Sequence, residues 1–151
     1  MSTAAIIVAA GRGARAGGAT PKQWREIAGQ SVLRHTLQAF HEHSEIDCVV
    51  LVLHGDDLDR APAVDGLILV TGGSERAASV KAGLEALPSI IKNVLIHDVA
   101  RPCVSPSMIS DVIAALDRSV GAAPALPITD ALWTGSDGHV TGTKDRRDLY
   151  R

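Results

Sequence analysis

Short, nearly continuous apolar runs are spread along the first two thirds of the chain. The first, Thr3–Ala9, is followed by glycines, which is typical of a strand buried on both faces of a parallel sheet. Three further runs have the same character, and each predicts a strand. They are Cys48–Leu53, Leu67–Val70 and Asn93–His97.

Between these runs, apolar residues recur every three or four positions, which predicts amphipathic helices. The first helix follows Ser31 and extends past Phe40, and the third follows the N-cap and N1 pair Ser105 and Pro106. The second covers Glu75–Leu87, with an expected packing face of Ala77, Val80, Leu84 and Leu87. Alternating strands and helices predict an α/β fold with a largely parallel sheet, helices on both faces and right-handed crossovers.

The pattern changes after the third helix. Gly121–Ile128 predicts another strand, and Leu132–Thr143 holds two short runs around a polar, glycine-containing turn, which favours an exposed hairpin. We therefore expect a β-arm over residues 129–147. No repeat or linker divides the chain, so we expect one domain over residues 1–151.

Composition limits the function classes. The chain has 151 residues, 46% of them hydrophobic, which suffices for one globular core. The 15 basic residues nearly balance the 17 acidic ones, so no overall field draws the protein to nucleic acid or to a membrane surface. No apolar stretch is long enough to span a bilayer and no basic leader begins the chain, so we expect a cytoplasmic protein.

The cysteines and histidines form no recognisable metal or redox motif. Cys48 and Cys103 are expected to be packing residues. His35, His41 and His43 are expected to be solvated, because they lie on the surface of the first predicted helix.

The segment Ala9–Gln23, directly after the first strand, carries the clearest chemical signal. Its glycines allow backbone N–H groups to turn toward a phosphate chain, and Arg12, Arg15 and Lys22 add three cations. In an open parallel sheet, ligands bind beyond the carboxyl ends of the strands. The segment therefore predicts a polyphosphate-binding loop at that edge of the sheet.

Two other phosphate-binding motifs fit this loop less well. Gly11-x-Gly13-x-x-Ala16 satisfies a loose dinucleotide fingerprint. However, Gly17-Gly18 and Pro21 would break the helix that should follow, and no acidic residue ends a second strand about twenty residues on. A Walker A sequence is absent.

Two further segments follow predicted strands. Gly72–Ser79 is a glycine turn that opens a helix. It offers backbone donors, an arginine and a hydroxyl that could contact a base or a ribose. A helix start with no ligand-binding role could have the same sequence.

In His97–Pro102, Asp98 ends a buried strand. One or two carboxylates together with substrate phosphates commonly hold Mg²⁺ in phosphoryl transfer, so Asp98 is the candidate metal ligand, with a loop cap or a pair with Arg101 as the alternative.

Three motifs occur in order: A-A-G-x-G-x-R followed by P-K-Q, then G-G-x-E-R-x-x-S, then H-D-x-A-R-P. From Ala4 to the last residue, the chain resembles the 2-C-methyl-D-erythritol 4-phosphate cytidylyltransferase family of the non-mevalonate isoprenoid pathway. The resemblance implies a Rossmann-like nucleotidyltransferase fold and a projecting β-arm that forms a homodimer. It also implies transfer of CMP from CTP to 2-C-methyl-D-erythritol 4-phosphate, with release of pyrophosphate.

The resemblance carries functional roles onto matching positions. Arg15 and Lys22 would act on the triphosphate and the transition state, Asp98 would hold Mg²⁺, and Arg146 of the arm would reach the methylerythritol phosphate in the partner's site. The remaining nucleotide-binding candidates are Ala9, Ala10, Gly11, Gly13, Gly73, Ser74, Arg76, Ser79, Ala100 and Arg101.

Departures from the family pattern leave alternatives open. The arm begins with Asp130-Ala131 where the family often has Asp-Thr, so ribitol 5-phosphate cytidylyltransferase is an alternative; sugar-phosphate and molybdopterin nucleotidyltransferases are more distant. The family continues past the position of Arg151, in some bacteria into a fused cyclodiphosphate synthase. We therefore expect a domain truncated at its C-terminus that is inactive alone, or a CTP-binding module without turnover.

Overall fold

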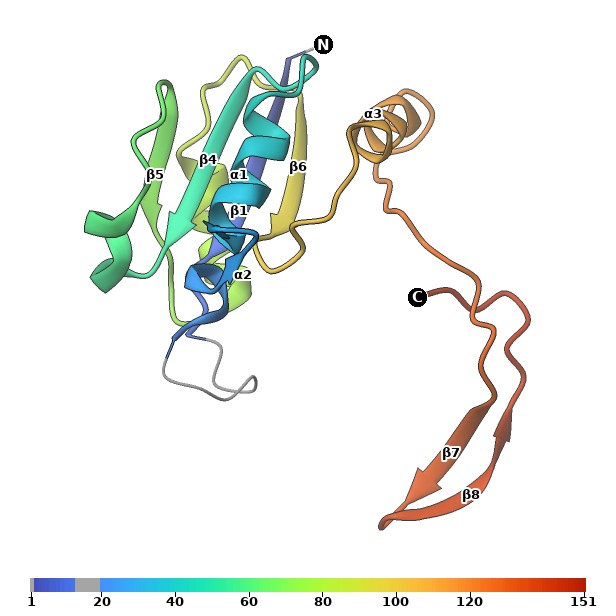
Figure 1. Ribbon diagram of the computed structural model, residues 1–151. Coiled ribbons are helices and arrows are strands. Elements are labelled where there is room, and N and C mark those ends of the chain that lie inside the picture. Colours follow the sequence, from blue (N-terminus) through green and yellow to red (C-terminus); the bar gives the residue numbers. More distant parts are fainter. Residues whose placement is uncertain (1, 13–19) are drawn as a thin grey trace.

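The computed structural model describes residues 2–12 and 20–151. A four-stranded parallel sheet of order β5-β4-β1-β6 forms its centre, with helices on both faces, which confirms the predicted α/β fold (Figure 1). Its strands coincide with the four apolar runs of the sequence. They are β1 (Thr3–Ala9), β4 (Cys48–Leu53), β5 (Leu67–Thr71) and β6 (Asn93–Asp98).

One face of the sheet is covered by α1 (Val32–His41), as predicted. Leu33, Leu37 and Phe40 pack against the β1 and β4 side chains of that face. The helix begins where the sequence predicted, because the Ser31 Oγ accepts a hydrogen bond of 3.2 Å from the Arg34 amide.

The other face is covered by α2 (Arg76–Glu85), and its predicted apolar face packs on the sheet only in part: Leu87, just past the helix, does so, whereas Ala77 is exposed. Leu84 is 43% exposed, and the buried positions are Ser79 and Gly83. A Cβ atom on Gly83 would lie 2.7 Å from the Ile6 Cγ2. The helix therefore approaches the sheet through small residues, a contact that apolar periodicity does not report.

The third helix, α3 (Pro106–Ala115), begins as predicted, with the Ser105 Oγ accepting from the Met108 amide at 3.2 Å. His43, predicted to be solvated, is instead buried, with its Nε2 3.1 Å from the Pro106 carbonyl oxygen. It lies past the end of α1, where the chain turns back toward the sheet and α3 covers it. Cys48 is half-buried, whereas Cys103 is exposed and so is not the packing residue we expected.

Within residues 20–31, a 3₁₀ helix and a small hairpin lead into α1. The 3₁₀ helix η2 (Lys22–Trp24) is followed by a small hairpin of β2 (Glu26–Ile27) and β3 (Gln30–Ser31). Another 3₁₀ helix, η3 (Gly55–Arg60), follows β4. Both 3₁₀ helices therefore stand near the carboxyl edge of the sheet.

The segment Gly121–Ile128 is not the predicted strand. It forms an isolated bridge between Pro127 and Tyr150, flanked by reciprocal 2.8 Å backbone bonds between Leu126 and Arg151. Pro124 and Pro127 have no N–H group to donate to a ladder, which explains why the segment does not form a regular strand.

A hairpin forms where the sequence predicted one. It pairs β7 (Leu132–Ser136) with β8 (His139–Lys144) and projects away from the sheet (Figure 1). Asp137 and Gly138 both have positive φ, at 51° and 80°, which matches the two-residue turn that suits the twist of a hairpin.

Candidate functional site

A cavity of about 860 Å³ lies at the carboxyl edge of the sheet. The first motif forms one wall, and its predicted residues Ala9, Ala10, Gly11 and Lys22 line the cavity. Gly13 and Arg15, the other predicted residues of this loop, lie outside the described residues. The position agrees with the expectation that ligands of a parallel sheet bind at this edge.

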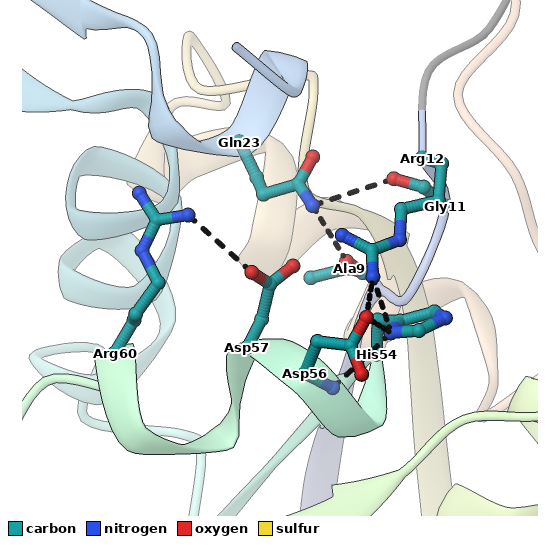
Figure 2. Close-up of polar contacts among 8 residues, drawn as sticks. All are labelled: Ala9, Gly11, Arg12, Gln23, His54, Asp56, Asp57 and Arg60. Carbon is teal, nitrogen blue, oxygen red and sulfur yellow. Dashed lines mark hydrogen bonds and ion pairs between the residues drawn. The ribbon is translucent and has the colours of Figure 1, made fainter.

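Gln23 fixes the position of Lys22. Its side chain is 2% exposed, and its Nε2 donates to the carbonyl oxygens of Ala9 at 3.2 Å and Gly11 at 3.3 Å (Figure 2). These carbonyls belong to the end of β1 and the start of the loop. Because Gln23 directly follows Lys22, both hydrogen bonds hold η2 against the loop.

The second motif forms the opposite wall, and Gly73, Ser74, Arg76 and Ser79 all line the cavity. Ser79 is buried, and its Oγ donates to the Glu75 carbonyl at 3.1 Å. The same hydroxyl donates to the Gly73 carbonyl at 3.4 Å, so it ties the glycine turn to the start of α2.

The turn lies directly against β1 because of its first glycine. A Cβ atom at Gly72 would stand 2.3 Å from the Ala10 Cβ and 2.8 Å from the Ser79 Oγ. Since real Cβ atoms do not approach so closely, glycine is needed here for the first and second motifs to share one cavity.

The third motif contributes Asp98 and Ala100 to the same cavity. Asp98 accepts from the Arg76 Nε at 3.0 Å and pairs with its Nη2 at 2.9 Å, while the Arg101 Nε is 3.9 Å from the other carboxylate oxygen. Arg101 itself lines a different cavity. Asp98 thus pairs mainly with the arginine of the second motif, a contact that the sequence did not predict.

The strand end that carries Asp98 is held by residues of α1. The buried Thr36 Oγ1 of α1 donates to the Val99 carbonyl at 2.7 Å. The His97 ring packs against Phe40 in a tilted arrangement, with ring centroids 4.8 Å apart, and its Nε2 is 2.9 Å from the Arg101 carbonyl oxygen. Burial lowers the pKa of His97 below its ordinary value, so its imidazole is neutral at pH 7 and serves packing.

The cavity is suited to an anion. Arg12, Lys22 and Arg76 line it, against the carboxylates of Asp98 and Glu75. Within the two described stretches, no cluster of three or more histidine, cysteine, aspartate or glutamate residues could hold a metal ion. A single carboxylate such as Asp98 therefore suits a cation whose remaining ligands are substrate phosphates and water, as is usual for Mg²⁺. It does not suit a cation whose ligands must all come from protein side chains.

Sequence reasoning missed His54 and Gly55, which also line the cavity. Both directly follow the apolar run Cys48–Leu53. The rule that pointed to Asp98, a polar residue at the carboxyl end of a buried strand, would have found His54 as well.

Another cavity, of about 790 Å³, lies between β6, α3 and residues 120–124. Apolar side chains such as Val94, Ile109 and Val112 form much of its lining, and Arg101 is its cation. A triphosphate needs several cations and backbone donors, so the cavity with the three motifs is the better nucleotide site.

Arg146 lies outside both cavities. It follows β8, is exposed, and its guanidinium donates to the Thr129 carbonyl at the base of the arm. Its predicted role at a partner's site is compatible with this position and is not tested by it.

Comparison with known proteins agrees with the three converging motifs. The model of the 2-C-methyl-D-erythritol 4-phosphate cytidylyltransferase family matches residues 3–151. The chain belongs to this family. Its members are nucleotidyltransferases that attach CMP from CTP to 2-C-methyl-D-erythritol 4-phosphate in isoprenoid biosynthesis.

Individual members of the family match the whole chain. It is 54% identical over 157 residues to the cytidylyltransferase of Cereibacter sphaeroides ATCC 17029, covering 100% of this chain and 70% of that protein. It is 58% identical over 153 residues to the bifunctional enzyme IspD/IspF of Ruegeria pomeroyi, covering 99% of this chain and 40% of that protein. The chain therefore corresponds to part of each relative.

Solved structures of the family share the fold. The cytidylyltransferase of Thermus thermophilus superposes with a TM-score of 0.78 at 32% identity, covering 100% of this chain and 67% of that one. A 4-diphosphocytidyl-2C-methyl-D-erythritol synthase gives 0.84 at 29% identity, covering 99% and 71%. None of the helices within residues 2–12 and 20–151 combines the length and apolar character needed to cross a membrane.

Proposed function

We propose that the cavity at the carboxyl edge of the sheet is where this cytidylyltransferase binds CTP and attaches CMP to 2-C-methyl-D-erythritol 4-phosphate, releasing pyrophosphate. The observation that carries the proposal is the convergence of the three motifs. Lys22, Arg76 and Asp98 lie far apart in the sequence and line one cavity.

The reaction is an in-line attack by a phosphate oxygen of the substrate on the α-phosphorus of CTP. It requires positioning and neutralisation of developing charge and no covalent nucleophile. Lys22 and Arg15 are the cations we assign to the transferring phosphate, and the backbone N–H groups of Gly11 and Gly13 are its proposed donors.

We assign the cytidine half of CTP to the second and third motifs. The support is their shared cavity with Ala9 and Ala10 and the close approach permitted by Gly72. The proposed residues that line this cavity are Gly73, Ser74, Arg76, Ser79 and Ala100. Arg101, which the resemblance also assigns to the cytidine half, lines the neighbouring cavity.

Mg²⁺ is the proposed cofactor, with Asp98 as its ligand from this chain. One Asp98 oxygen pairs with Arg76, whereas the other is 3.9 Å from the Arg101 Nε, beyond hydrogen-bonding distance. Asp98 would hold the ion, which would supply positive charge to neutralise the triphosphate.

We also propose that the β-arm forms a homodimer and that Arg146 contacts the methylerythritol phosphate in the partner's site. The support is the exposure of Trp133, at 70%, and of Arg146 itself on a hairpin that projects from the sheet. The cytoplasmic location expected from the sequence remains a prediction.

The test supplies CTP, Mg²⁺ and either 2-C-methyl-D-erythritol 4-phosphate or ribitol 5-phosphate, and measures pyrophosphate release. In a protein that carries this domain together with the remaining length of its relatives, we expect transfer to methylerythritol phosphate. Lys22→Ala should lower kcat by roughly 10² or more, the scale for loss of one preorganised charge-stabilising donor.

Lys92→Ala is the matched control, because Lys92 is exposed just before β6, at the opposite edge of the sheet. A loss of tenfold or less for Lys22→Ala, or an equal loss for both variants, would remove Lys22 from the mechanism. Preference for ribitol 5-phosphate would overturn the proposed substrate.

A further inference from the structure

We propose that Arg12 is an additional triphosphate-binding residue that exchanges partners: Asp56 holds it in the free chain, and CTP takes it over. The proposal rests on the proposed function, because it needs CTP in the cavity at the carboxyl edge. Arg12 lines that cavity from the first motif, next to Gly11 and on the same side as Lys22.

Arg12 is already held in the free chain. Its Nη2 forms an ion pair with the Asp56 carboxylate and lies 3.0 Å from the His54 Nδ1 (Figure 2). A guanidinium can only donate, so His54 Nδ1 accepts this bond. All three side chains meet at the junction of β4 and η3.

Asp56 is placed by the fold and not by Arg12. The His54 side chain caps η3, because its Nδ1 also accepts from the Asp56 amide at 3.2 Å. This bond fixes the Asp56 backbone at the start of the turn, beside the cavity wall formed by His54 and Gly55. The carboxylate is thus a preformed counter-ion for the arginine.

This counter-ion is easy to displace. The Arg12 and Asp56 side chains are 46% and 72% exposed, and an exposed ion pair favours its bound form by at most about fivefold. A triphosphate carries several charges and offers oxygen pairs that suit the planar guanidinium fork. It should therefore outcompete the single carboxylate, whereas a monophosphate should do so poorly.

The exchange makes an unusual prediction, namely that removing an acidic residue improves nucleotide binding. Calorimetric titration with CTP in Mg²⁺ should give a Kd about two- to fivefold lower for Asp56→Asn than for the unsubstituted chain. Arg12→Gln should raise the Kd about tenfold or more, as loss of a charged hydrogen-bond donor does. When Asp56→Asn is added to Arg12→Gln, it should no longer lower the Kd for CTP, because the competing contact between Arg12 and Asp56 no longer exists.

Asp59→Asn is the matched control for net charge, since Asp59 is an exposed acid on the same turn. It should change the Kd for CTP by less than twofold. The Asp56→Asn gain should also shrink with CMP in place of CTP. Thermal unfolding of each variant should occur within a few degrees of the unsubstituted chain, because both Arg12 and Asp56 are exposed.

The outcomes separate this proposal from the one on which it rests. If the unsubstituted chain binds no CTP, both proposals are overturned. If CTP binds and Asp56→Asn leaves the Kd unchanged, raises it, or lowers it no more than Asp59→Asn, the partner exchange is wrong while the nucleotide site stands. An equal Asp56→Asn gain with and without Arg12 would likewise overturn it.

Discussion

The central sheet and the arm are both built from β-strands, and they differ in what surrounds the strands. In β4, every residue from Val49 to Leu53 is buried between the helices of the two faces. In the β7 and β8 hairpin, Trp133 is 70% and Val140 61% exposed. The sheet is therefore stabilised by its own core, whereas the arm has little beyond its own ladder of hydrogen bonds.

This contrast explains where chemistry and association are placed. A two-stranded hairpin is marginally stable alone in water, so the arm is poorly suited to fix reacting groups and well suited to contact a partner. The cavity instead lies at the ends of buried strands, where Gln23 and Thr36 anchor its walls to the core. Rigid strands hold the groups that must be positioned accurately.

The largest effect on folding should come from the core of the sheet. Leu51→Ala should lower the free energy of unfolding by about 2–5 kcal/mol, since it removes a fully buried side chain from a central strand. Val140→Ala in the arm should change it by less than about 0.5 kcal/mol. Urea unfolding followed by circular dichroism measures both. Similar losses of unfolding free energy for the two variants would contradict the view that the sheet has a core and the arm does not.

A smaller effect should come from the anchor of the loop. Gln23→Leu removes the donor to the buried Ala9 carbonyl and to the part-buried Gly11 carbonyl, and should cost about 1–3 kcal/mol of unfolding free energy. It should also weaken CTP binding, because Lys22 loses its fixed position.

Gln38→Leu is the control for this anchor, since Gln38 is exposed on α1 and bonds Glu42. It should change stability by about 0.5 kcal/mol or less and leave CTP binding unchanged. Equal stability losses for the two variants would mean that the Gln23 hydrogen bonds do not anchor the loop.

The smallest effect on folding should come from Trp133→Ser. This variant should have an unfolding free energy within about 0.5 kcal/mol of that of the unsubstituted chain, but its proposed homodimer should be weaker. Sedimentation velocity measures the dimer. Leu126→Ser replaces an apolar residue of similar exposure outside the hairpin and should leave association unchanged. Equal behaviour of the two variants would show that the arm is not the contact.

The same contrast governs what the sequence could predict. The strands of the sheet were predicted correctly, because a strand buried on both faces must be apolar throughout. The packing face of α2 was predicted only in part: Leu87 packs on the core, but Gly83 and Ser79 permit a close approach that no apolar stripe marks. Gly121–Ile128 was predicted wrongly, because Pro124 and Pro127 have no N–H group to donate to a ladder, although the segment is largely apolar.

The order of the motifs predicted many of the residues that line the cavity, but it did not predict which of their side chains form ion pairs with one another. Lys22, Arg76 and Asp98 were expected at one edge and do line one cavity. The pairing of Arg76 with Asp98 and of Arg12 with Asp56 depends on side-chain directions that spacing does not report. Arg101 lines the neighbouring cavity instead, because the chain turns away from the sheet edge after Ala100.

The central claim is that CTP binds at the carboxyl edge of the sheet and not elsewhere on the chain. Amide NMR of the ¹⁵N-labelled chain during titration with CTP in Mg²⁺ tests it most directly. We predict shifts at Gly11, Lys22, Gly73 and Asp98, and none at Val112 beside the apolar cavity. Shifts centred on Val112, or none at the carboxyl edge at saturating CTP, would contradict the account.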